Sequence, residues 1–75
     1  MMKPLKDLVI IKEIKEKNEL QVSELSKGIV ISVGPEVKGI KAKDIVYFYK
    51  KNNRIIDLEL SYIFDEDALF VEGND

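Results

Sequence analysis

The sequence predicts a small all-β domain, most simply a barrel built from five or six short strands. Two observations lead to this fold class. Short runs rich in β-branched and aromatic residues recur along the 75-residue chain, and Gly, Pro, Asn, Asp or Lys residues separate them. Five or six such runs with turn signals between them suggest a small barrel rather than a layered α/β domain. A chain of this length can form only one core, so we expect a single domain spanning residues 1–75.

The first half of the chain contains two expected strands. Leu5–Ile14 carries a β-branched run directly after Pro4, and this combination favours a strand over a helix. Lys15–Ser26 is mostly charged and polar, and its pattern fits a loop, a short strand or a short helix equally. Gly28–Val33 is the second expected strand, and Gly34-Pro35 ends it, because Gly permits positive φ and Pro lacks an amide donor.

The second half continues the same pattern. Asp44–Tyr49 is β-branched and aromatic, and Lys50–Arg54 is typical of a hairpin tip. Ile55–Leu60 alternates apolar and acidic residues, as a half-exposed strand does. Tyr62–Phe64 and Ala68–Val71 are the last two expected strands, with an acidic turn between them.

Composition excludes several classes of function. The chain has no cysteine and no histidine, so thiol chemistry, Ser-His or Cys-His catalysis and the commonest metal ligands are ruled out. We therefore expect no enzyme activity, no cofactor and no bound metal. The formal net charge of −2 provides no overall positive field for nucleic acid or anionic lipid. A signal peptide and an apolar run of membrane-spanning length are both absent, so we expect a cytoplasmic protein without membrane contact.

Two local features allow a functional and a structural interpretation. The acidic residues Asp65–Asp67 could hold a hard cation, but they lack the ligand spacing of a calcium loop, so we expect a solvated turn. Tyr47, Phe48 and Tyr49 precede Lys50-Lys51, as in the stacking platforms of single-strand-binding barrels. Alternation sends Phe48 to the opposite face from the two tyrosines, so packing in a core or an interface is the favoured interpretation, and we do not expect nucleic acid to bind.

Charge is also unevenly distributed along the chain. Lys38–Arg54 holds six cationic residues and one acid, whereas Asp57–Asp75 holds seven acids and no base. This polarity fits either head-to-tail contacts between copies or two solvated faces.

Four blocks, taken in order, resemble the GroES co-chaperonin family. Pro4–Lys12 is similar to the family's opening Pro-Leu-x-Asp-x-Val-x-Val-Lys, and Gly28–Pro35 to its Gly-x-Val-x-x-Val-Gly-x. Ile40–Phe48 is similar to Val-Lys-x-Gly-Asp-x-Val-x-Phe, and Tyr62–Glu72 to the family's C-terminal block. Each block is weak alone, and the specificity lies in their order and spacing.

The resemblance implies a partly open β-barrel that assembles as a homo-oligomer, usually a ring of seven. Such a ring caps a GroEL-type chaperonin double ring in a nucleotide-dependent cycle, and the chaperonin hydrolyses the ATP. Family rings close by pairing the N-terminal strand of one subunit with the C-terminal strand of the next. This implies subunit-interface residues Leu5, Leu8, Val9, Ile10, Ala68, Leu69, Phe70 and Val71.

The segment that would dock on the chaperonin departs most from the family. The family has a long glycine-containing loop there, with an apolar docking tripeptide, whereas Glu13–Lys27 is short and lacks glycine. The docking candidates are therefore Leu20, Val22 and Leu25; the alternative is that these three pack on the barrel. In a rival alignment Lys27–Ile31 is the docking stretch, but that choice leaves no residues for the following strand.

Two further consequences follow from these departures. Lys43 stands where the family has a turn glycine, so the turn either adopts another backbone conformation or accepts strain. The chain could also be a divergent or phage-type relative that kept the barrel, lost chaperonin binding and serves as a structural or adaptor module. A nucleic-acid-binding small barrel is the third hypothesis, with Lys38–Arg54 as its contact region.

Overall fold

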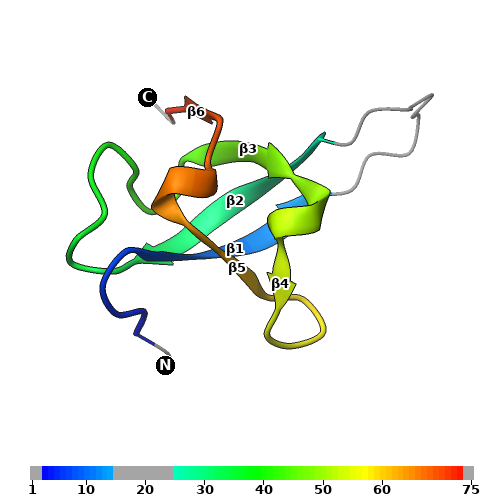
Figure 1. Ribbon diagram of the computed structural model, residues 1–75, viewed down its shortest axis with the longest axis horizontal. Helices are drawn as coiled ribbons and strands as arrows, with labels where there is room; N and C mark the ends of the chain where they lie inside the picture. Colours follow the sequence, from blue (N-terminus) through cyan, green and yellow to red (C-terminus); the bar gives the residue numbers. More distant parts are fainter. Residues whose placement is uncertain (1–2, 15–24, 74–75) are drawn as a thin grey trace.

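The chain folds into one six-stranded antiparallel sheet (Figure 1). A computed structural model describes residues 3–14 and 25–73. In chain order the elements are β1 (Leu8–Ile14), β2 (Leu25–Val33), β3 (Ile45–Tyr49), the 3-10 turn η1 (Lys50–Asn52), β4 (Arg54–Ile55), β5 (Ser61–Phe64), the 3-10 turn η2 (Asp65–Asp67) and β6 (Phe70–Glu72). The all-β prediction is confirmed. No helix in the described residues is long and apolar enough to cross a membrane.

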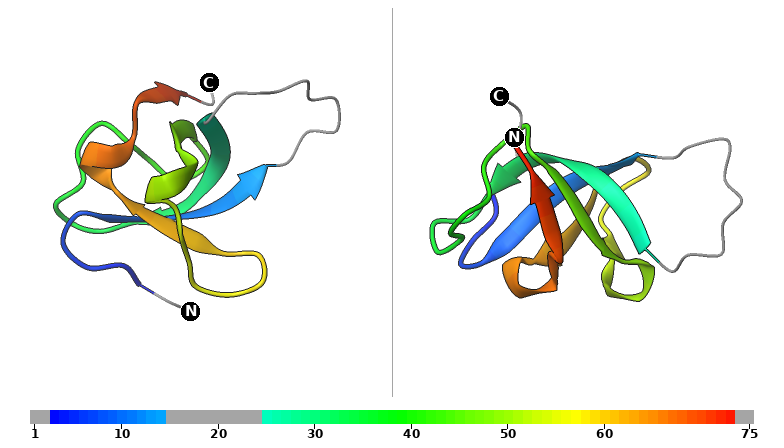
Figure 2. Two further views of the ribbon diagram at one scale, coloured as in Figure 1. Left: turned by 45° about the vertical axis from the view of Figure 1, so that its right-hand side comes forward. Right: turned by 90° about the horizontal axis from the view of Figure 1, so that it is seen from above.

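The sheet curls but does not close. Its strand order is β4-β5-β1-β2-β3-β6, so β5 and β6 lie far apart in the order although only η2 and two further residues join them. The chain therefore crosses the open side of the curled sheet at this point, as both views in Figure 2 allow the reader to follow. Two backbone hydrogen bonds fix the crossing, from Asp65 N to Asp7 O at 2.9 Å and from Leu69 N to Tyr47 O at 2.8 Å. The result is a partly open β fold with edges at β4 and β6.

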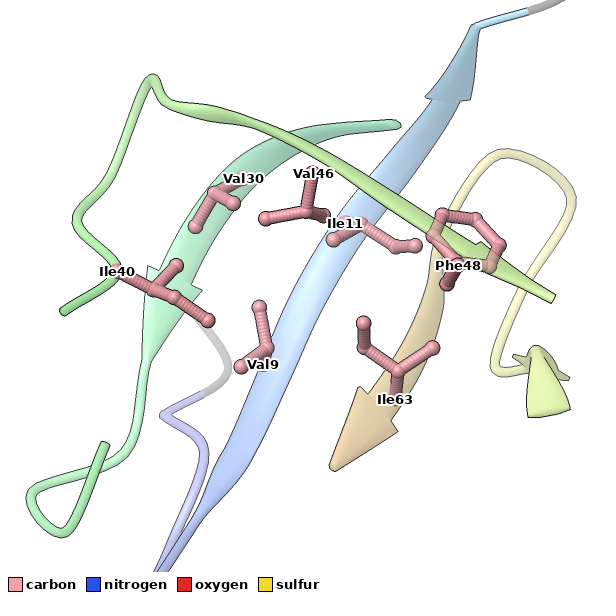
Figure 3. Close-up of a cluster of buried hydrophobic side chains, with 7 residues drawn as sticks. All are labelled: Val9, Ile11, Val30, Ile40, Val46, Phe48 and Ile63. Atoms are coloured by element: carbon pink, nitrogen blue, oxygen red, sulfur yellow. The ribbon is translucent and has the colours of Figure 1, made fainter. Parts of the chain in front are cut away.

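The core lies on the concave face of this sheet. Successive side chains of a strand point to opposite faces, so every second residue of β2 and β3 is directed inwards. Figure 3 shows these side chains converging from the central strands and from the loop before β3. The cluster consists of Val9, Ile11, Val30, Ile40, Val46, Phe48 and Ile63.

A bulge between β1 and β2 changes which side chains are exposed. Ile10 pairs with Ser32 and Ile11 pairs with Val30, so Ile31 has no partner opposite it on β1. A bulge of this kind bends the strand and re-aims a side chain. Ile31 is exposed, whereas Val9, Ile10 and Ile11 are all buried.

Two sequence expectations for the second half were wrong. Residues 55–60 do not form a strand: β4 ends at Ile55, and the amides of Ile56 and Asp57 both donate to Leu60 O, at 2.8 and 3.0 Å. The apolar and acidic alternation there belongs to a tight turn between β4 and β5. The expected hairpin at Lys50–Arg54 is also absent, because β3 pairs with β2 and β6 while β4 pairs with β5.

The turn at Lys43 could either adopt another backbone conformation than a glycine turn or accept strain, and the structure shows which. Its φ is 79°, so the lysine adopts the left-handed conformation that glycine would adopt at less cost. Hydrogen bonds around it hold this geometry: Lys43 N donates to Val30 O at 2.7 Å, and Lys41 N donates to the buried Asp44 Oδ2 at 3.0 Å. The turn therefore keeps the glycine-like conformation and accepts strain.

Candidate assembly and docking surfaces

The C-terminal strand β6 is an apolar edge. It pairs with β3 on one side through Val71 and Phe70, and no described strand pairs with its other side. Phe70 is 63% exposed, and Leu69 and Val71 are also exposed. Ala68 differs, because it is half-buried and packs against the core. An edge strand with unpaired backbone groups and exposed apolar side chains is a template for pairing with another chain.

The N-terminal strand offers less to a neighbour than the resemblance implies. β1 pairs with β5 on one side and with β2 on the other, so both of its edges are occupied within the chain. The side chains of Val9 and Ile10, two of the expected interface residues, are buried within the chain. Leu8 is half-buried in the same paired strand. The residues before β1 are left for such a contact, and Leu5 among them is 67% exposed.

The convex side of β2, β3 and β6 carries an aromatic surface. Directly opposed residues in antiparallel strands share a face, and three cross-strand rows follow from the register: Leu25 with Tyr49, Lys27 with Tyr47 and Phe70, and Ile29 with Ile45 and Glu72. Phe48 points the other way and is fully buried, which confirms the alternation expected for the three aromatic residues.

Ring contacts and cations organise this surface. The rings of Tyr47 and Phe70 meet edge to face, with centroids 6.4 Å apart. Lys27 Nζ lies 6.0 Å from the Tyr47 centroid and Lys51 Nζ lies 5.7 Å from the Tyr49 centroid, both within the range of cation–π attraction. The Tyr47 hydroxyl lies 3.2 Å from Glu72 Oε1 and donates a hydrogen bond to it. The Glu72 carboxylate beside Tyr47 disfavours a phosphate backbone at this end of the surface.

A second exposed apolar patch lies on the turn between β4 and β5. Leu58 is 98% exposed and Ile55 is 79% exposed. Sequence reasoning missed this patch because the alternation of residues 55–60 indicated a strand with one buried face. The Leu58 amide donates to Asp57 Oδ1 at 2.7 Å, and this local contact is typical of a turn.

The docking candidates divide between two parts of the chain. Leu25 is the first residue of β2, half-buried and opposite Tyr49, so it belongs to the sheet. Leu20 and Val22 lie outside the described residues. Gly28–Val33 lies within β2, as the strand interpretation required, and the rival alignment of Lys27–Ile31 as a docking stretch was wrong.

The acidic residues 65–67 form the turn η2. Asp67 Oδ2 accepts a hydrogen bond from Phe64 N at 3.3 Å, so this carboxylate serves the turn. Among residues 3–14 and 25–73, no three acidic side chains are grouped in a way that could hold a metal ion.

No family model matches the chain, and no curated protein matches it. The proposed role therefore rests on the chemistry of the β6 edge and of the aromatic surface.

Proposed function

We propose that this chain is a co-chaperonin-like subunit, related to GroES, that forms a homo-oligomeric ring and caps a GroEL-type chaperonin in the cytoplasm. The protein itself is not an enzyme in this proposal; the chaperonin supplies the ATP hydrolysis. The observation that carries the proposal is the apolar edge strand β6 of a curled, open sheet. An exposed edge of this kind favours aggregation of a monomer, whereas in an assembly it pairs with a strand of the neighbouring subunit.

The order of the family-like blocks supports the same proposal. The first block covers most of β1, the second lies largely in β2, the third leads into β3, and the last runs from within β5 to the end of β6. The two ends of the match thus lead to the segment before β1 and to the free edge of β6. A neighbour could pair at either place without breaking the pairing within the sheet.

One observation favours the alternative of a relative that has lost chaperonin binding. Leu25 is one of three apolar docking candidates, and it is integrated into β2. Docking through the connection between β1 and β2 would then depend on Leu20 and Val22 alone. Two apolar side chains give a smaller contact than the family's tripeptide, so this alternative predicts assembly without chaperonin binding.

The test is sedimentation of the purified protein with a GroEL-type double ring in the presence of ATP or ADP. Co-migration that depends on nucleotide supports the proposed function. The double variant Leu20→Asp, Val22→Asp should abolish co-migration and leave self-assembly intact. Its matched control, Asn18→Asp with Gln21→Asp, places two carboxylates in the same segment and should still co-migrate. A wild-type protein that assembles but ignores the chaperonin would reject this function in favour of the adaptor alternative.

A further inference from the structure

Strand β3 carries apolar or aromatic residues on both faces, which is unusual for an antiparallel sheet with one solvated side. The concave face is the core. The convex face carries a set of residues that we term the outer aromatic face: Lys27, Ile29, Ile45, Tyr47, Tyr49 and Phe70. A contiguous apolar face on a small protein marks an interaction site.

The turn between β4 and β5 presents a protruding apolar side chain between acidic residues, which complements the outer aromatic face. Its tip, Leu58, is almost completely exposed and lies between Asp57 and Glu59. The two hydrogen bonds to Leu60 O hold the turn in shape. Glu59 Oε1 lies 3.5 Å from Lys12 Nζ on β1, so this side chain also ties the turn to the sheet.

The two surfaces cannot cover one another within a single chain. β4 and β6 are at opposite ends of the strand order. Figure 1 shows β6 at the top of the molecule and the β4–β5 turn at the bottom. Complementary surfaces on separate sides of one molecule produce head-to-tail contacts between copies.

We propose that the outer aromatic face of one copy receives the β4–β5 turn of a second copy, with Leu58 placed among Tyr47, Tyr49 and Phe70. Charge supports this occupant: Asp57 and Glu59 flank Leu58 on the turn, and the Lys51 ammonium lies over Tyr49 at the exposed end of the face. Aromatic residues such as Tyr47, Tyr49 and Phe70 are enriched at the centres of protein interfaces.

The contact is compatible with pairing at the β6 edge. The N-terminal segment before β1 lies on the same lower side of the molecule as the turn in Figure 1, and the outer aromatic face adjoins the β6 edge. One neighbour could therefore contribute both its N-terminal segment and its turn. This inference rests on the proposed assembly of the chain and not on chaperonin binding.

The test uses complementary variants and sedimentation velocity without any chaperonin. Leu58→Asp removes the inserted side chain, and Tyr49→Asp disrupts the receiving face. Each alone should weaken self-association by at least about tenfold, with an unchanged circular dichroism spectrum. Mixed in equal amounts, the two variants should form a heterodimer, because each retains the surface that the other lacks. Lys38→Asp, at an exposed turn position away from both surfaces, should associate like the wild type.

Three results would overturn the contact. They are a monomeric wild type, self-association unaffected by Leu58→Asp, and a mixture of the variants that does not associate. A monomer that binds a single-stranded oligonucleotide through Tyr49 would assign the face to nucleic acid instead. Tyr49→Ser replaces Tyr49→Asp if the latter does not fold. Loss of chaperonin co-migration with Leu58-dependent association intact would reject only the proposed function.

Discussion

The two faces of β2 and β3 have similar composition but different surroundings. On the concave face, Val30, Val46 and Phe48 are enclosed by side chains from four strands and a loop. On the convex face, Tyr47 and Tyr49 alternate with these residues along β3, yet they remain partly exposed. Apolar content alone therefore does not define a core: the curl of the sheet encloses one face and leaves the other partly exposed.

The largest loss of stability is expected from a substitution on the concave face. Phe48→Ala removes a fully buried ring and should reduce the free energy of unfolding by about 3–5 kcal/mol. Tyr49→Ala, one residue away on the convex face, should cost below about 1 kcal/mol and instead reduce self-association. Chemical denaturation of both variants measures the difference. Equal losses of stability would show that both faces belong to the folding core.

A second prediction concerns the close packing between the end of β2 and the N-terminal segment. A Cβ on Gly34 would lie 2.3 Å from Lys6 O, and the obstacle is backbone. Gly34→Ala should therefore destabilise the fold by about 1–3 kcal/mol or displace the segment that carries Leu5. Gly73→Ala is the matched control, since nothing lies within 4 Å of its added Cβ. Thermal unfolding of the two variants decides, and an unperturbed Gly34→Ala would contradict this packing.

A third prediction tests the turn that leads into β3. Asp44 is buried and its Oδ2 accepts the Lys41 amide. Asp44→Ala leaves that amide without its acceptor and should cost about 1–3 kcal/mol. Asp44→Asn keeps an acceptor oxygen and should cost less. Urea unfolding of the pair measures this, and equal losses would mean that the hydrogen bond contributes little.

The smallest expected effect is stabilising. Lys43 has a positive φ, so Lys43→Gly relieves backbone strain and should raise the free energy of unfolding by roughly 0.5–1 kcal/mol. Lys41→Gly, two residues earlier and without positive φ, should lower it. The same unfolding experiment separates these outcomes. Destabilisation by Lys43→Gly would indicate that the lysine side chain contributes more than the strain costs.

The sequence predicted the fold where alternation and β-branching coincide with burial. The strands at Leu8–Ile14, Leu25–Val33 and Ile45–Tyr49 all fall within or around predicted runs. The strand prediction for residues 55–60 was wrong because an exposed turn can alternate apolar and acidic residues just as a strand does. Only the presence of a pairing partner distinguishes the two. The Lys43 conformation was foreseen as one of two outcomes, since a glycine position occupied by lysine implies strain.

The candidate site was harder to predict than the fold. A sequence places Tyr47 and Tyr49 on one face, but their alignment with Lys27 and Phe70 depends on the register of three strands. The burial of Val9 and Ile10 likewise depends on β1 lying between β5 and β2. Such contacts are non-local, so no pattern within one segment contains them.

We propose that the exposed apolar edge of β6 and the outer aromatic face make this chain assemble. Sedimentation equilibrium of the wild-type protein over a wide range of concentrations tests it most directly. We expect a mass that is a multiple of the 8.6 kDa chain and that falls towards the monomer in Leu58→Asp. A mass of one chain at every concentration would contradict it.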